Sequence, residues 1–123
     1  MECKKTEYSK YISLINVISN PEKYHGKGLI LKGYLSIENL TAPTLAYLYV
    51  SRDDLDYGIT KNALVINWPS SFRASVLSSN LSYILIEGQF DKSKLGPWSL
   101  YSGGLDCIER VDKIEKRSSV LKE

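Results

Sequence analysis

The stretch GLILKGYLSIE, residues 28–38, decides the fold class because the character of its side chains alternates with a period of two. Its leucines and Ile37 fall on one face, while Lys32, Tyr34 and Ser36 fall on the other. A glycine inside a strand weakens it, so Gly33 indicates a bend or bulge where the sheet curves. The stretch therefore predicts a half-buried strand in a curved sheet.

Further along the chain, β-branched and aromatic residues again alternate between turn signals, which predicts more short strands. These lie at residues 45–51, 62–68, 82–90 and 98–111, with Gly88 marking curvature and the last strand broken or bulged at Gly103-Gly104. Between the third and fourth strands, Ser70 or Ser71 can cap a short helix that buries Phe72, Val76 and Leu77.

The N-terminal region has helical spacing instead. An amphipathic helix is predicted at about residues 9–19. It should end at Asn20-Pro21, because a proline disfavours helix at the residue before it. Its apolar stripe consists of Tyr8, Tyr11, Ile12, Ile15 and Ile18. The order of elements predicts one domain over residues 1–123. It is mainly β, a five-stranded OB-like Greek-key barrel at about residues 27–111, followed by a charged tail at 112–123.

The segments ISLINVISNPEKYHGKGLILKGYL, LYVSRDDLDYGITKNALVIN and YILIEGQFD resemble a group of small bacterial proteins with an OB-like barrel. The resemblance runs from about Ile12 to Glu109 and implies a fold; it carries over no functional residue. A looser likeness connects such barrels with immunity proteins that neutralise nuclease toxins.

The composition is that of an ordinary globular protein, with 43% hydrophobic residues, 24% charged residues and a net charge of +2. No apolar run is long enough to span a membrane. Cys3 and Cys107 form no metal-ligand pattern, and sequence alone does not establish a disulfide between them. A free Cys3 thiol in a cytoplasmic protein is the expectation; the alternative is a lipid-bearing Cys3 in the bacterial envelope.

The stretch RDDLDYGITKN, residues 52–62, holds the densest group of acidic side chains, Asp53, Asp54 and Asp56. Its spacing does not match an EF-hand loop, and no partner acid, base or ligand set lies nearby in the sequence. The single histidine, His25, lies in a predicted turn with no triad spacing. We therefore expect no metal, no cofactor and no catalytic residue, and an acidic connector between strands that exposes Tyr57 beside the aspartates.

Three tyrosines on neighbouring predicted strands, Tyr34, Tyr47 and Tyr49, point away from the barrel interior if the leucines point inward. In OB barrels such aromatic residues stack bases or sugars, although packing beneath the N-terminal helix is the favoured reading here. Residues 34–68 contain two basic and four acidic residues, a local charge of −2 that disfavours a nucleic-acid groove.

The sequence thus predicts a non-catalytic binding module. Its expected ligand is a protein, such as a basic toxin domain, recognised through Asp53, Asp54, Asp56 and Tyr57. The alternatives are a binder of single-stranded nucleic acid or oligosaccharide that uses the three tyrosines, and an accessory domain of an envelope lipoprotein.

Overall fold

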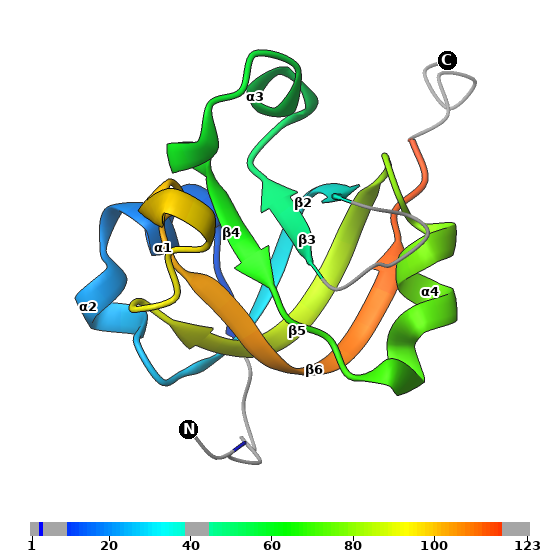
Figure 1. The fold of residues 1–123 in the computed structure, drawn as a ribbon. Helices are drawn as coiled ribbons and strands as arrows, with labels where there is room; N and C mark the ends of the chain where they lie inside the picture. Colours follow the sequence, from blue (N-terminus) through cyan, green and yellow to red (C-terminus); the bar gives the residue numbers. More distant parts are fainter. Residues whose placement is uncertain (1–2, 4–9, 39–44, 117–123) are drawn as a thin grey trace, which may run out of the picture.

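The computed structural model of the chain describes residue 3, residues 10–38 and residues 45–116. In these residues five strands close into a barrel, with one additional short strand and several short helices around it (Figure 1). The mainly β, OB-like barrel predicted from the sequence is confirmed, including the short helix between the third and fourth barrel strands.

The strands are β1 (Lys10–Tyr11), β2 (Gly28–Ile37), β3 (Ala46–Tyr49), β4 (Ala63–Ile66), β5 (Tyr83–Asp91) and β6 (Gly104–Lys113). The helices are α1 (Leu14–Ser19), α2 (Pro21–Tyr24), α3 (Arg52–Asp56) and α4 (Arg73–Ser78), and three 3₁₀ turns are η1 (Thr60–Asn62), η2 (Ser70–Phe72) and η3 (Pro97–Ser99). The sheet order is β1-β2-β3-β4-β6-β5, and an additional β2–β5 pairing closes the barrel. The β1–β2 and β4–β6 pairs are parallel, and the other pairs are antiparallel.

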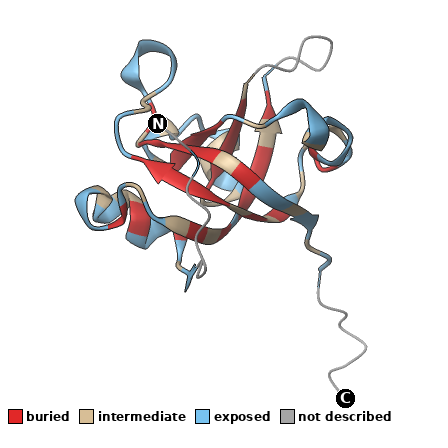
Figure 2. Ribbon diagram, turned by 90° about the horizontal axis from the view of Figure 1, so that it is seen from below, coloured by how far each residue is buried: buried red, intermediate tan, exposed pale blue. Residues whose placement is uncertain are grey.

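Alternation along β2 fills the barrel interior as the sequence predicts. Its leucines and Ile37 are buried, and the inner faces of the other strands meet them in a continuous core (Figure 2). Gly33 lies where β2 passes from its pairing with β5 to its pairing with β3. A Cβ atom at Gly33 would lie 2.7 Å from the Leu48 side chain and from the Tyr49 carbonyl oxygen, so this bend requires glycine.

The N-terminal helix is shorter than predicted. Lys10 and Tyr11 form β1 beside β2, and α1 begins only after Ser13, whose side chain accepts a hydrogen bond from the Asn16 backbone N–H at 3.2 Å. The buried face of α1 carries Leu14 and Val17, while Ile15 of the predicted stripe is 59% exposed. Tyr8 of that stripe lies outside the described residues. Ile12 and Ile18 of the stripe pack partly against the core. The prediction was wrong at Tyr11 and Ile15, because the helix that begins after Ser13 turns Leu14 and Val17 inward instead.

The last strand also differs from the prediction. It begins at Gly104, whereas residues 98–103 form part of the connection from β5. Gly103 has a φ of +144°, and a Cβ atom there would lie 2.7 Å from the Phe90 ring, so this position belongs to a tight turn before the strand. The irregularity in β6 lies further on, between Asp106 and Arg110, where its register with β5 shifts opposite Gly88.

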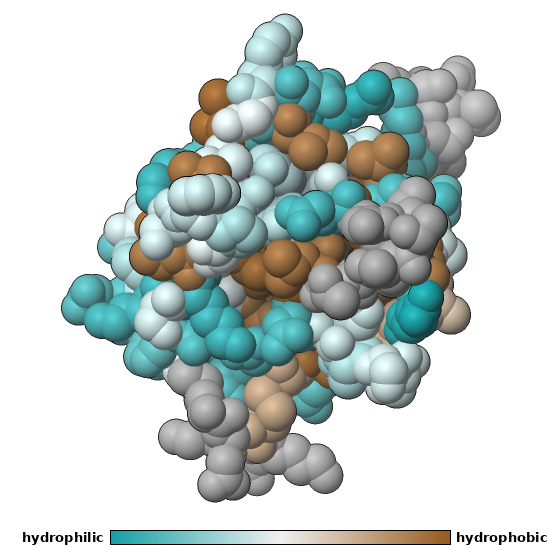
Figure 3. All heavy atoms as spheres, viewed as in Figure 1, coloured by the Kyte–Doolittle hydropathy of each residue, from teal (hydrophilic) through white to brown (hydrophobic). Residues whose placement is uncertain are grey.

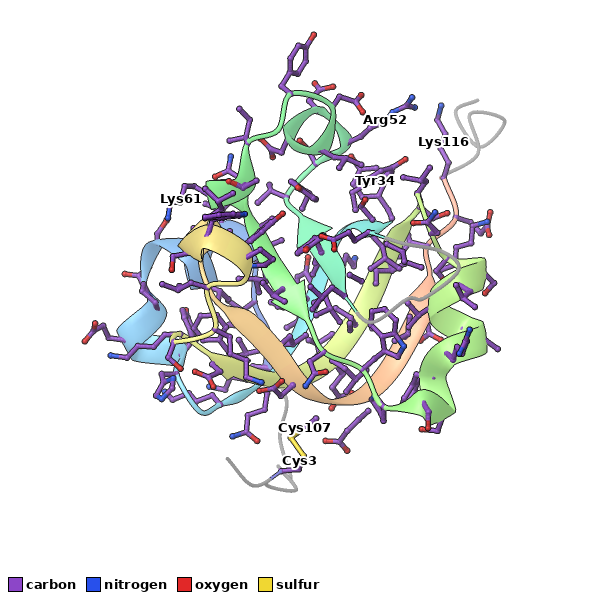
Figure 4. All side chains as sticks on the ribbon, viewed as in Figure 1. Cys3, Tyr34, Arg52, Lys61, Cys107 and Lys116 are labelled. Carbon is purple, nitrogen blue, oxygen red and sulfur yellow. A yellow bond between two sulfur atoms is a disulfide. The ribbon has the colours of Figure 1, made fainter. Side chains whose placement is uncertain are left out.

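The two cysteines form a disulfide, Cys3–Cys107, at the foot of the barrel (Figure 4). The expectation of a free Cys3 thiol was therefore wrong. The sequence did not reveal the bond because 104 residues separate the two cysteines, and only the β5–β6 register brings Cys107 to this end of the barrel.

Candidate functional site

The acidic stretch forms α3 and the connection from β3 to β4, as predicted, and Asp54 holds this connection together. Ser51 caps the helix by accepting a hydrogen bond from the Asp54 backbone N–H at 3.3 Å, and its hydroxyl donates to Asp54 Oδ2 at 3.0 Å. Asn62 Nδ2 donates to Asp54 Oδ1 at 3.0 Å across the connection. Both carboxylate oxygens of Asp54 are therefore used inside the protein.

The other predicted partner-binding residues face solvent. Asp56 forms an ion pair with Arg52 at 3.5 Å on the surface of α3, whereas the Asp53 carboxylate has no side-chain partner in the described part of the chain. Tyr57 is 79% exposed, and Gly58, with a φ of +66°, ends the helix just after it. The structure thus brings Asp53, Asp56 and Tyr57 to one exposed loop and turns Asp54 inward.

The tyrosines of the alternative platform are buried, at 8% exposure or less. Tyr34 lies opposite Tyr49 across the β2–β3 pair. Tyr47 precedes Tyr49 by two residues in β3 and therefore lies on the same face of the sheet. They form a second apolar cluster outside the barrel, which Tyr101 from the β5–β6 connection completes and against which Leu55 of α3 packs. In the described residues, the loops rather than the N-terminal helix cover these rings.

Close contacts fix this tyrosine cluster. The Tyr47 and Tyr101 rings are stacked, with centroids 4.4 Å apart and an angle of 7° between their planes. Burial, together with the hydrogen bond that the Tyr47 hydroxyl donates to Glu38 Oε1 at 2.5 Å, raises the pKa of Tyr47 far above its ordinary value. Burial and the neighbouring Tyr101 raise the pKa of Tyr49 to about 12. Both phenols are therefore neutral at physiological pH and act as core residues in this conformation.

The most exposed aromatic side chain in the described residues is Trp98, which sequence reasoning missed. It is 90% exposed and lies in η3, and its neighbour Leu100 and the residue Ile59 before η1 are also exposed. Lys61 joins the two turns, because its Nζ donates to the Ser99 carbonyl at 3.3 Å and its own carbonyl accepts from Ser102 Oγ at 2.6 Å (Figure 4). The sequence signal was a tryptophan directly after Gly-Pro, in a turn where an apolar core residue is not expected.

We call this region the loop surface and define it as Asp53, Asp56, Tyr57, Ile59, Trp98 and Leu100. It combines large exposed apolar side chains with one unpaired carboxylate, on the connections at one end of the barrel. Residues on connections of a rigid scaffold commonly carry binding functions.

His25 follows α2 and is not part of the loop surface. Its Nδ1 accepts a hydrogen bond from the Lys92 backbone N–H at 3.1 Å and lies 3.9 Å from Asp91 Oδ1. Burial would raise the pKa of the Asp91 carboxyl, but hydrogen bonds from Ser93, with His25 and Lys94 nearby, lower it below its ordinary value. Over the described ranges, no three His, Cys, Asp or Glu side chains are grouped closely enough to hold a metal ion.

Comparison with known proteins supports the fold. No family model matches the sequence, and neither does any curated protein. A solved structure of a "putative aspartyl-tRNA synthetase" from Leishmania major Friedlin matches with a TM-score of 0.54 and 11% identity over 95% of this chain, which corresponds to 23% of that protein. The hypothetical protein ygiW from E. coli matches with a TM-score of 0.53 and 12% identity, covering 89% of this chain and all of that one. At these identities the likeness shows a shared small barrel fold, and the resemblance to bacterial immunity proteins stays a prediction.

Proposed function

We propose that the protein is a non-catalytic module that binds a protein partner through the loop surface. The exposure of Trp98 carries this proposal, because a tryptophan with 90% of its surface in water contributes almost nothing to the stability of the isolated fold. Tryptophan is enriched among the residues that dominate binding energy at protein interfaces. Tyr57, Ile59 and Leu100 add further exposed apolar surface on the connections around it.

The Asp53 carboxylate is the feature of the loop surface that a basic partner would recognise, since Arg52 and Lys61 on the same connection balance the rest of its charge. Asp53 is exposed and unpaired within the described chain, and Asp56 has only the exposed Arg52 as its partner. An inhibitor of a basic protein, as in the immunity-like reading of the sequence, would use the exposed apolar side chains for binding energy and the Asp53 carboxylate for charge complementarity. Asp54 is left out of this interface because its carboxylate serves the α3 connection.

The test compares the tagged wild type with three variants in affinity capture from the natural host, followed by calorimetry with the captured protein. Trp98→Ala should lower the affinity by at least about 30-fold, the loss typical of an interface hot spot. The double variant Asp53→Lys/Asp56→Lys should weaken binding of a basic partner and slow its association. Glu115→Lys, an exposed acidic residue beyond the loop surface, is the matched control. Equal affinity for all four proteins would refute the proposal.

The alternative, a ligand stacked on Tyr34, Tyr47 and Tyr49, is favoured only by the OB-like barrel itself, since oligonucleotides and oligosaccharides bind such barrels along these strands. It requires Tyr101 to move away from Tyr47 and uncover the rings. Short single-stranded oligonucleotides and oligosaccharides that quench tyrosine emission, with loss of the effect in Tyr49→Phe/Tyr47→Phe, would favour this alternative over the loop surface.

We propose, against the expectation of a cytoplasmic protein, that this one works in an oxidising compartment. Disulfides persist in such compartments and are rare in the reducing cytosol. The Cys3–Cys107 bond also occupies the sulfur that a lipid anchor on Cys3 would need. Among the described residues, no helix is both long and apolar enough to span a bilayer. Trapping free thiols in intact cells tests the proposal: unreacted Cys3 and Cys107 support it, and full alkylation of both contradicts it.

A further inference from the structure

A groove of about 390 Å³ lies between β1, α2 and the start of β2, and none of its lining residues belongs to the loop surface. Its apolar wall is formed by Ile12, Tyr24 and Leu29, and its basic wall by Lys10, Lys23 and Lys27. The corner of the molecule where α2 lies is covered by hydrophilic atoms (Figure 3). The groove is within the size range of small-molecule sites, roughly 300–1,000 Å³.

The charge of this groove is of one sign. No carboxylate is among its lining residues, and none of the three ammonium groups forms an ion pair in the described part of the chain. Glu22, the neighbour of Lys23, is paired with Lys92 at 3.4 Å instead. Lys23 Nζ lies 5.5 Å from the centroid of the Tyr24 ring, which places a positive charge directly over the apolar wall.

We propose that this groove binds a small amphipathic anion, with the apolar part against Tyr24 and Leu29 and the carboxylate or phosphate among the three lysines. The apolar wall alone would accept any hydrophobic molecule, and the lysines alone would accept any anion. Their presence in one hollow selects a ligand that has both parts, because each part left unmatched loses its share of the binding energy.

The backbone geometry makes the groove a fixed feature. The Gly26 N–H donates to the Phe90 carbonyl at 2.8 Å, and the Lys27 carbonyl accepts from the Phe90 N–H at 3.0 Å. These bonds join the end of α2 to β5, so the backbone that carries Lys27, directly after Gly26, and Lys23, three residues before it, is held in place. With the backbone and the buried Tyr24 and Leu29 already in place, only the lysine side chains need to be ordered on binding.

The test uses octanoate, octanol and octylammonium, which share one apolar tail and differ in charge. Two-dimensional NMR of the whole protein, labelled with ¹⁵N, should show octanoate shifting the Gly26, Gly28 and Leu29 amides. Octanol and octylammonium should bind roughly tenfold more weakly, the sum of three partly exposed charge interactions. The octanoate affinity should also fall with added salt, because exposed charges are screened.

The variant Lys10→Gln/Lys23→Gln/Lys27→Gln should abolish the preference for octanoate over octanol, while Lys113→Gln/Lys116→Gln should keep it. All five lysines are exposed, so both variants are expected to fold. Three outcomes would overturn the proposal: equal binding of octanoate and octylammonium, shifts confined to the loop surface, or an unchanged octanoate preference in the triple variant.

Discussion

Replacing Trp98 with glycine should make the protein more stable, although tryptophan is among the largest apolar side chains. Trp98 has a φ of +59° and a ψ of 16°, the left-handed region, which costs a non-glycine residue about 1–2 kcal/mol. The indole is 90% exposed, so its removal forfeits little buried area. Glycine relieves the backbone cost but loses about 0.5–1 kcal/mol through the entropy of the unfolded chain. With the middle of each range taken, the net expected gain is about 0.5–1 kcal/mol.

Urea unfolding and calorimetry of wild type, Trp98→Gly and Trp98→Ala measure this effect. Trp98→Gly should raise Tm by roughly 2–5 °C, from the entropy of unfolding of a chain of this size. Trp98→Ala keeps the Cβ atom and its strain, so its stability should stay within about 0.5 kcal/mol of wild type. Both variants should lose the partner, which separates the cost of the residue to the fold from its use in binding.

The reasoning fails if Trp98→Gly lowers the free energy of unfolding by more than about 1 kcal/mol. Such a loss would mean that the indole packs against neighbouring side chains in solution and that its exposure is not a property of the fold. A similar loss of stability in Trp98→Ala would point to the same conclusion, because the removal of the indole is what the two variants share.

Three other predictions concern stability. Asp54→Ala should cost about 1–2 kcal/mol through its lost hydrogen bonds, against less than about 0.5 kcal/mol for Asp53→Ala, as urea unfolding would show; equal losses would contradict the assigned roles. The lowered pKa of Asp91 stabilises the fold above about pH 4, the range of an unfolded aspartate, and this contribution disappears as pH falls through the lowered value. Asp91→Asn should therefore be less stable than wild type at neutral pH and equal to it in strong acid, and a pH-independent difference would argue against the charge. Removing the disulfide with Cys3→Ser/Cys107→Ser should cost roughly 3–5 kcal/mol for a loop spanning 104 residues, and a loss below about 1 kcal/mol would mean that the terminus is held by other contacts.

The barrel could be predicted because its signals are local. Alternation along β2 and the glycines at 33 and 88 mark strands and curvature within a few residues of sequence, and the structure uses them where expected. The start of α1 was misplaced because Tyr11 and Ile12 fit the spacing of a helical stripe, whereas the pairing of Lys10 and Tyr11 with β2 makes this segment extended.

The candidate site was harder to predict because contacts between distant parts of the chain determine which of its side chains are exposed. The partners of Asp54 include Asn62, eight residues away, and no spacing rule separates this inward carboxylate from Asp53. Tyr47 is covered by Tyr101 from another part of the chain, so the sequence could place its ring outside the barrel but could not tell what lies over it.

The buried tyrosine cluster also holds the turn that carries the exposed Trp98, and so limits how far this side chain can move. Gly96, with a φ of +67°, packs so closely that a Cβ atom would lie 2.7 Å from Val65 and 2.8 Å from the Tyr101 ring. The Tyr101 N–H donates to the Leu95 carbonyl at 3.0 Å, closing the turn at its base. The turn that carries Trp98 is therefore fixed at both ends on the tyrosine cluster. An anchor side chain held in this way loses less conformational freedom on binding, so Gly96→Ala, which disturbs the base of the turn without touching the indole, should weaken partner binding as well as the fold.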